Sequence, residues 1–295
     1  MSEFVLSCCS TADLSREYLK KRDIHYICFH FELGGIQYLD DLGISISHAD
    51  RYKRMAAGAD AKTSQIGAAE YIEYFEEFLK EGKDILHLTL SSGISGTLNS
   101  AILAQRELSE KYPDRKLIVI DSLAASSGYG LLMDYLADLR DAGRSIDELA
   151  EYAEENRLFI NHWFFSSDLT YYIKGGRVTK AAGLIGTILN ICPLLNVDYK
   201  GCLIPREKIK SKKKVIKRIV EKMVECADDG TSYSGKCFIS HSECLEDAQA
   251  VANLIEEQFP ALKGKVRIFD IGATIGSHTG PGTVALFFHG KKRVD

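Results

Sequence analysis

Residues 84–111 have the sequence DILHLTLSSGISGTLNSAILAQRELSEK, in which three patterns follow one another. Asp84–Leu90 is a short apolar run that predicts a buried strand, and the small residues of Ser91–Gly96 predict a turn. Thr97–Lys111 predicts a helix, because its apolar residues recur on one helical face: Leu98, Ala101, Ile102 and Leu108. A strand followed by a turn and an amphipathic helix is typical of mainly parallel sheets covered by helices.

The same alternation of strand and helix continues on both sides of this segment. Further strands are predicted for Phe4–Cys8, His25–Phe31 and Lys116–Ile120, because these runs are short, largely apolar and contain β-branched residues. Helices are predicted for Ala68–Lys80, for Gly128–Asp141 and for a segment from a Ser145 cap to Asn156. We therefore expect an N-terminal α/β domain of residues 1–157, with a mainly parallel sheet and helices on both faces.

Residues 158–295 are expected to form a second, smaller α/β domain. Apolar runs predict strands at Leu158–Phe165, Lys236–His241, Val266–Asp270 and Val284–Phe288. Helical periodicity predicts helices at Lys180–Leu189, Lys212–Cys226 and Glu243–Gln258. A chain of 295 residues also exceeds what one ordinary core supports, which favours two domains.

Composition and missing motifs argue against several classes of function. The formal net charge of −4 gives no overall attraction to nucleic acid. The eight cysteines form no CxxC pair and no zinc-like spacing with histidine, so we expect reduced thiols and no metal site. Without a signal-peptide pattern or a membrane-spanning run, a cytoplasmic protein with no stable membrane anchor is expected. A phosphate-binding GxxxxGK[ST] loop, a GxGxxG turn, HExxH and GxSxG are all missing.

Three polar clusters lie where a predicted strand ends and a helix or loop begins, which is where open α/β sheets bind ligands. They are Lys62–Gln65, Ser91–Thr97 and Gly276–Gly282. In the second cluster Ser95 is predicted to be the N-cap of the helix, where the free N–H groups of Gly96 and Thr97 favour an anionic oxygen. In the third, the glycines around His278 predict a tight loop that approaches a ligand.

Each cluster taken alone also has a purely structural interpretation. Ser95, like Thr63 and Ser64 before the preceding helix, can simply cap a helix, an effect of about 1 kcal/mol. His278 can be a structural hydrogen-bonding residue of its loop. The same residue types also permit a serine hydrolase, with Ser95 as nucleophile, His278 as base and an acid such as Asp270. A regulatory or scaffolding protein is a third possibility.

Taken together and in this order, the motifs resemble those of the DegV family, the fatty-acid-binding subunits of bacterial fatty acid kinase. The resemblance extends over nearly the whole chain and is most specific in the SSxxSGT and HTGPG motifs. The matching segments are Ser10–Leu14, Tyr38–Asp41, Thr63–Gln65, Ser91–Thr97, Asp121–Ser122, Lys174–Arg177 and His278–Gly282. The chain departs from the family pattern in three places: Cys9 stands where an aspartate is usual, Lys62 and Ile66 replace the usual threonine and proline, and Lys208–Lys210 replaces a motif ending in arginine.

The resemblance implies a two-domain DegV-like fold that buries a long-chain fatty acid such as palmitate, with the carboxyl near the domain interface. The residues implied to bind that carboxyl are Thr63, Ser95 and His278. The residues implied to form the supporting loops are Ser64, Gly96 and Thr279.

The resemblance also implies a carrier and not an enzyme, with no catalytic residue, no metal and no cofactor of its own. In this family a separate ATP-dependent fatty acid kinase phosphorylates the bound acid to an acyl phosphate. Arg177 and Lys210 are implied to lie near the surface on which that kinase docks. Such a division of labour agrees with the missing phosphate-binding loop.

Overall fold

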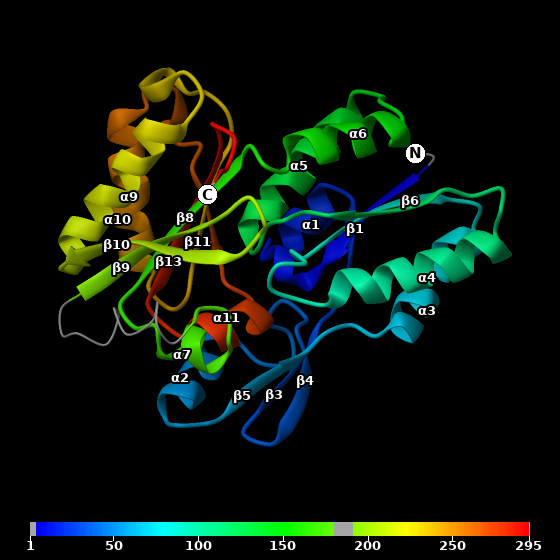
Figure 1. The fold of residues 1–295 in the computed structure, drawn as a ribbon, viewed down its shortest axis with the longest axis horizontal. Helices are drawn as coiled ribbons and strands as arrows, with labels where there is room; N and C mark the ends of the chain where they lie inside the picture. The colour runs from blue at the N-terminus through cyan, green and yellow to red at the C-terminus, as the bar shows by residue number, and fades with distance from the viewer. Residues whose placement is uncertain (1–3, 180–190, 295) are drawn as a thin grey trace.

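The computed structural model describes residues 4–179 and 191–294 and arranges them around three sheets (Figure 1). The first is a parallel sheet with the strand order β2-β1-β6-β7. Its strands are β1 (Phe4–Cys9), β2 (Ile24–Ile27), β6 (Asp84–Thr89) and β7 (Leu117–Asp121). All but the first residue of β1 and of β6 are buried, as expected for strands covered on both faces.

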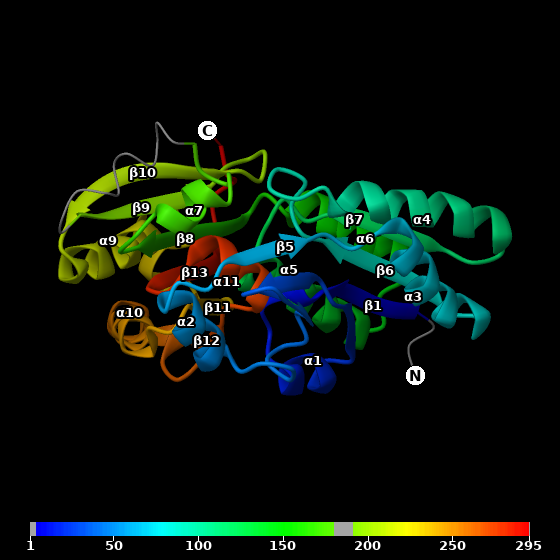
Figure 2. The same ribbon diagram turned by 90° about the horizontal axis from the view of Figure 1, so that it is seen from below.

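Helices cover both faces of this parallel sheet (Figures 1 and 2). On one face lie α3 (Ala68–Lys80) and α4 (Thr97–Lys111). On the other lie α1 (Arg16–Lys21), α5 (Ser127–Asp141) and α6 (Ile146–Asn156). The mainly parallel sheet and the α/β fold class predicted from the sequence are confirmed.

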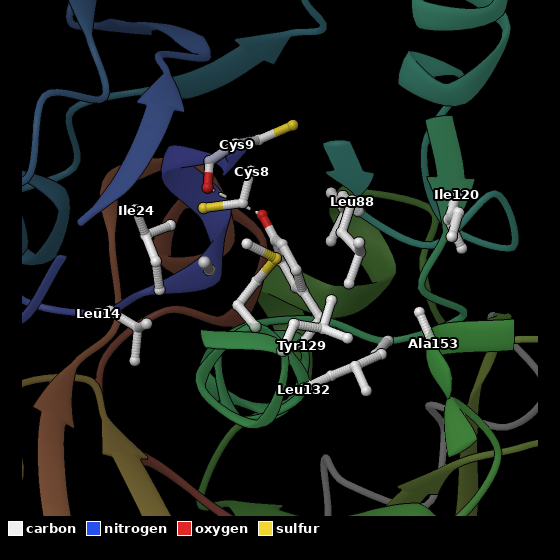
Figure 3. Packing of buried hydrophobic residues seen from close by; sticks show 14 of the residues in the cluster. Cys8, Cys9, Leu14, Ile24, Leu88, Ile120, Tyr129, Leu132 and Ala153 are labelled. Carbon is white, nitrogen blue, oxygen red and sulfur yellow. Dashed lines mark hydrogen bonds between the residues drawn. The ribbon is translucent and has the colours of Figure 1, made fainter. Parts of the chain in front are cut away.

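Helix α5 joins the first sheet to the second, and most of its residues are buried. Figure 3 shows Tyr129 of α5 among Cys8, Leu88 and Leu132 in the core of the first sheet. The Tyr129 hydroxyl donates a hydrogen bond to the Cys9 carbonyl at 2.9 Å, which satisfies a polar group that is cut off from water.

The second sheet has the strand order β10-β9-β8-β13-β11-β12 and is antiparallel except between β11 and β12. Its strands are β8 (Ile160–Ser166), β9 (Ile191–Val197), β10 (Leu203–Lys210), β11 (Cys237–His241), β12 (Arg267–Asp270) and β13 (Thr283–His289). Helices α9 (Lys212–Cys226) and α10 (Leu245–Gln258) cover one face. Alternate residues such as Phe164 and Phe287 point to the other face, toward the first sheet.

The third sheet is small and antiparallel, with the order β4-β3-β5. Its strands are β3 (His30–Leu33), β4 (Ile36–Leu39) and β5 (Ala61–Ser64), and α2 (His48–Ala56) packs beside it. Two short helices, α7 (Thr170–Lys174) and α11 (Ala273–Thr279), lie between this sheet and the second one (Figure 1). The 3-10 turns are Ser10–Ala12, Gly230–Ser232 and Pro260–Leu262.

The predicted single strand His25–Phe31 is wrong, because the chain forms β2 and β3 in two different sheets. Phe29 lies between the two strands, and its backbone forms hydrogen bonds with residues outside them. Its N–H donates to Ser10 Oγ at 3.1 Å, and its carbonyl accepts from Asp40 N at 2.8 Å. Phe29 and Phe31 therefore do not share a strand face. In the sequence, Phe29 and Phe31 alternate with Cys28 and His30 through this break, so periodicity alone could not locate it.

The expected helix cap at Thr63 and Ser64 is also wrong. Both residues end strand β5, and the N-cap of α3 is Gly67. The predicted helix Lys180–Leu189 lies outside the described residues.

Candidate functional site

A cavity of about 230 Å³ lies between the inner face of the second sheet, the loops that follow β6 and β7, and helices α7 and α11. This volume far exceeds the roughly 10–15 Å³ that one buried water needs. Its apolar lining comes from both large sheets and their loops: Phe29, Leu90, Ile94, Ala125, Phe164, Val197, Leu203, Ile271, Ile275, Ala285 and Phe287. Such a lining suits a long hydrocarbon group.

Three residues predicted for the carboxyl site come from three separate elements and line this one cavity. Thr63 lies in β5 and His278 in the last turn of α11, and their Oγ1 and Nε2 atoms are 2.7 Å apart. Ser95 lies in the turn between β6 and α4, and its Oγ accepts a hydrogen bond from Thr97 N at 3.3 Å. The cavity therefore has a polar wall of two hydroxyls and an imidazole.

Only two of the three residues predicted to form the supporting loops lie at the cavity. Gly96 and Thr279 line the cavity, whereas Ser64 is exposed at the end of β5 and does not. Gln65 was not predicted and does line it. Gly96 makes room for this side chain, since a Cβ there would lie 2.5 Å from Gln65 Oε1. The position of Gln65 in the same polar cluster as Thr63, Lys62–Gln65, is the feature of the sequence that could have identified it.

Two local predictions in this region are wrong. The N-cap of α4 is Gly96, so Ser95 lies one residue before it. His278 lies on helix α11 and not in a loop; the loop begins at Gly280, whose φ of +65° ends the helix. The glycines of this segment have low helix propensity, so its sequence favoured a loop.

Helix α11 is held by two buried carboxylates from the first half of the chain. Asp40 accepts hydrogen bonds from Ala273 N and Thr274 N, and Asp13 accepts one from Gly272 N, each at 2.9 Å. A helix of seven residues is not stable by itself, and its first N–H groups need partners. These two aspartates, which belong to the Ser10–Leu14 and Tyr38–Asp41 motifs, therefore fix the helix that presents His278.

The polar wall of the cavity is neutral at His278 and positive at Arg177. Burial, and then the Arg177 charge, lower the pKa of His278 to about 4. Its Nδ1 is buried and has no hydrogen-bond partner. Arg177 is half-buried in the cavity lining, where its Nε donates to the Ile94 carbonyl at 3.2 Å and its Nη1 to the Gly175 carbonyl at 2.5 Å. A carboxylate in this cavity would therefore lie near a fixed positive charge.

This pKa gives a testable pH dependence. Because the folded state holds the pKa of His278 near 4 and an unfolded histidine titrates near 6.5, the unfolded state binds more protons between these values. The stability from neutral His278 is present above pH 6.5 and is lost as pH falls toward 4. Urea titrations should show less loss of stability over this range in His278→Gln than in the wild type. Equal loss in both proteins would contradict the assignment.

The serine hydrolase arrangement is not assembled among the described residues. In this part of the chain His278 Nε2 pairs with Thr63 and forms no hydrogen bond with Ser95, and Nδ1 lacks the acid that orients the base of a triad. Asp270 lies instead beside His241, with Oδ1 3.5 Å from its Nε2. The residue types of a hydrolase are present, but their geometry differs.

The other predicted positions lie outside the cavity or form no further site. Lys210 is exposed at the end of β10 and does not line the cavity. Within residues 4–179 and 191–294, histidine, cysteine and acidic side chains form no group that could hold a metal ion. In the same part of the chain, none of the helices has the length and apolarity needed to cross a membrane.

The chain is similar along nearly its whole length to known proteins. The family model described as an uncharacterised protein of the DegV family matches residues 9–291. A DegV domain-containing protein of Clostridium perfringens is 38% identical over 293 residues, 98% of each chain. A Thermotoga maritima protein whose structure revealed a fatty acid binding function is 28% identical, with a TM-score of 0.83 over 99% of this chain and 100% of that chain.

The same fold occurs in the Fatty Acid Kinase (Fak) B3 protein of Streptococcus pneumoniae, whose structure is loaded with linoleic acid. It is 22% identical, with a TM-score of 0.84 over 99% of this chain and 100% of that chain. The match to the family model and to the Clostridium relative shows that the chain belongs to the DegV family.

Proposed function

We propose that this chain is a fatty acid carrier that buries one long acyl chain between an N-terminal domain, residues 1–157, and a C-terminal domain, residues 158–295. The observation that supports it most is a single cavity with an apolar lining from both halves and a polar wall of Thr63, Ser95 and His278. A fatty acid has the same division into a long apolar tail and one polar head.

The tail supplies the affinity in this proposal. At about 0.8 kcal/mol per buried methylene, a chain of about fifteen gains on the order of 12 kcal/mol before the costs of binding are subtracted. The head supplies orientation, because a buried carboxylate without partners would cost several kcal/mol. The Thr63 and Ser95 hydroxyls donate to the carboxylate, and the Arg177 charge favours its ionised form.

We also propose that a separate ATP-dependent fatty acid kinase converts the bound acid to an acyl phosphate. The missing phosphate-binding loop and the motifs shared with the family support this proposal, as does the place of Arg177 beside the polar wall. Lys210, exposed on β10, would meet an acidic surface of the kinase. Lys210→Glu should lower the rate of acyl phosphate formation by more than it lowers acid affinity; equal loss of both would remove Lys210 from docking.

A cytoplasmic location is part of the same proposal. All eight cysteines are free thiols, and Cys8, Cys9, Cys192 and Cys237 are buried. Unpaired cysteines are typical of a reducing compartment.

Ser95→Ala tests the carboxyl site. Loss of one hydrogen bond to the charged head should weaken binding of a long-chain acid about tenfold, and the folded structure should persist. Isothermal titration calorimetry measures the affinity, with Ser92→Ala as the matched control because Ser92 is exposed in the same turn and does not line the cavity. Unchanged affinity would remove Ser95 from the site.

Lipid extraction tests the carrier itself. Mass spectrometry of an organic extract of the purified protein should show a long-chain fatty acid in near-stoichiometric amount. If no acid is extracted and none is taken up on addition, the proposed function is wrong.

A further inference from the structure

The polar wall of the cavity meets solvent where strand β5 ends and where the turn after β6 leads into α4. Gln65 and Gly96 line the cavity there, and both are exposed at the surface of the protein. Thr63 and Ser95, which belong to the same two segments, are partly exposed. The candidate carboxyl site therefore lies at a mouth of the cavity, within reach of side chains that also contact solvent.

The Gln65 side chain is close to both hydroxyls of this site. Gln65 follows Thr63 by two residues at the end of β5, and alternate residues of an extended chain point to the same side. Its amide lies against the turn that contains Ser95, because a Cβ on the adjacent Gly96 would be 2.5 Å from Gln65 Oε1. The amide is therefore placed to contact a head group that also contacts Thr63 and Ser95.

The structure fixes this amide without using all of its donors. Gln65 Nε2 donates to Ser100 Oγ at 3.2 Å, and Ser100 is a buried residue of α4. A side-chain amide nitrogen carries two hydrogens, and within residues 4–179 and 191–294 no hydrogen bond uses the second one. This N–H is available to an acceptor at the mouth. Because the side chain is already held, it loses little conformational freedom when it binds one.

An ionised carboxylate matches these donors better than a neutral head group does. Its two oxygens accept about four hydrogen bonds, so the Thr63 and Ser95 hydroxyls leave capacity for a further donor. Hydrogen bonds to a charged acceptor are about twice as strong as bonds between neutral groups. The Arg177 charge in the same lining favours the ionised form as well.

We propose that Gln65 binds the head group together with Thr63, Ser95 and His278. Its second N–H donates to the carboxylate oxygen that faces the mouth, and this contact selects ionised acids against neutral lipids with the same tail. The inference rests on the proposed function, because it adds a binding residue and a specificity to the same site.

Two substitutions of Gln65 separate a contact with the carboxylate from a purely structural role. Gln65→Glu keeps the length of the side chain and an acceptor for the Ser100 hydroxyl, but it replaces the donor with a negative charge. Gln65→Leu removes the donor and the bond to Ser100 without adding charge. If Gln65 binds the carboxylate, Gln65→Glu should weaken binding of octadecanoic acid more than tenfold and Gln65→Leu only about threefold, because like charges repel. A structural role gives the opposite order, since only Gln65→Leu loses the contact with Ser100.

Calorimetry on the full-length protein at neutral pH measures these affinities, with octadecanoic acid and octadecan-1-ol as probes. The alcohol has the same tail and no charge, so Gln65→Glu should change its affinity no more than about twofold. The matched control is Gln249→Glu, which makes the same change of charge at an exposed residue of α10 outside the cavity. It should leave both affinities unchanged.

Three results would overturn the inference: unchanged acid affinity in Gln65→Glu, equal weakening of acid and alcohol by this variant, or a larger loss of acid affinity in Gln65→Leu. The order of the two variants is measured with the acid alone, so it decides the matter even if the alcohol does not bind. Failure of the wild type to bind octadecanoic acid would instead overturn the proposed function.

Discussion

Asp40→Ala should lower the free energy of unfolding by about 3 kcal/mol or more and weaken fatty acid binding more than tenfold. Asp40 is 1% exposed and accepts hydrogen bonds from the first two N–H groups of α11, Ala273 and Thr274. Alanine leaves both N–H groups buried without a partner and removes the negative charge that complements the helix N-terminus. The helix that presents His278 then loses its anchor. Urea titration and calorimetry measure the two effects.

Two further variants separate anchoring of α11 from general loss of stability. Asp40→Asn keeps one acceptor oxygen and should recover part of both losses. Asp50→Ala removes an exposed aspartate of α2 that forms hydrogen bonds with Ser47, and should cost no more than about 1 kcal/mol. If Asp40→Ala lost stability while the acid still bound at wild-type affinity, Asp40 would not position the carboxyl site.

The elements that could be predicted from sequence are those whose burial shows in their composition. Strands β1, β6 and β7 and the helices α3, α4, α5 and α9 lie within a few residues of their predicted bounds, because strongly apolar runs and amphipathic periodicity identify them. Strands β4, β5, β9 and β10 were missed. Strands β4, β5 and β10 are short or half-exposed and contain residues such as Lys62, Glu207 and Lys208, so their patterns do not differ from those of a loop. Strand β9 is mostly buried but contains Pro193, a residue that is unusual within a sheet.

The cavity could not be predicted from local patterns, because it depends on contacts between distant parts of the chain. Thr63 and His278 are 215 residues apart in sequence, and only the order of motifs indicated that they belong together. Helix α11 forms against the low propensity of its glycines, because Asp13 and Asp40 bind its N-terminus. His162 is one residue of an apolar strand in the sequence, and only the fold shows that it faces the cavity.

Gly175→Ala should weaken fatty acid binding more than tenfold, because it removes the space that His278 occupies. A Cβ at Gly175 would lie 2.3 Å from His278 Nδ1 and 3.2 Å from the Tyr171 carbonyl. The backbone is not the obstacle, since Gly175 has a φ of −74°, which alanine adopts freely. The imidazole must therefore move away from Thr63, at a cost of about 1–3 kcal/mol in stability.

The matched control for this substitution is Gly67→Ala, which also has an ordinary φ of −77°. The nearest atom to its added Cβ is the flexible Glu70 Oε2 at 3.3 Å, so both affinity and stability should change little. Calorimetry with octadecanoic acid gives the affinities, and NMR of the His278 imidazole reports its displacement from Thr63. A Gly175→Ala protein that bound the acid as tightly as the wild type would show that the ring position is not needed for binding.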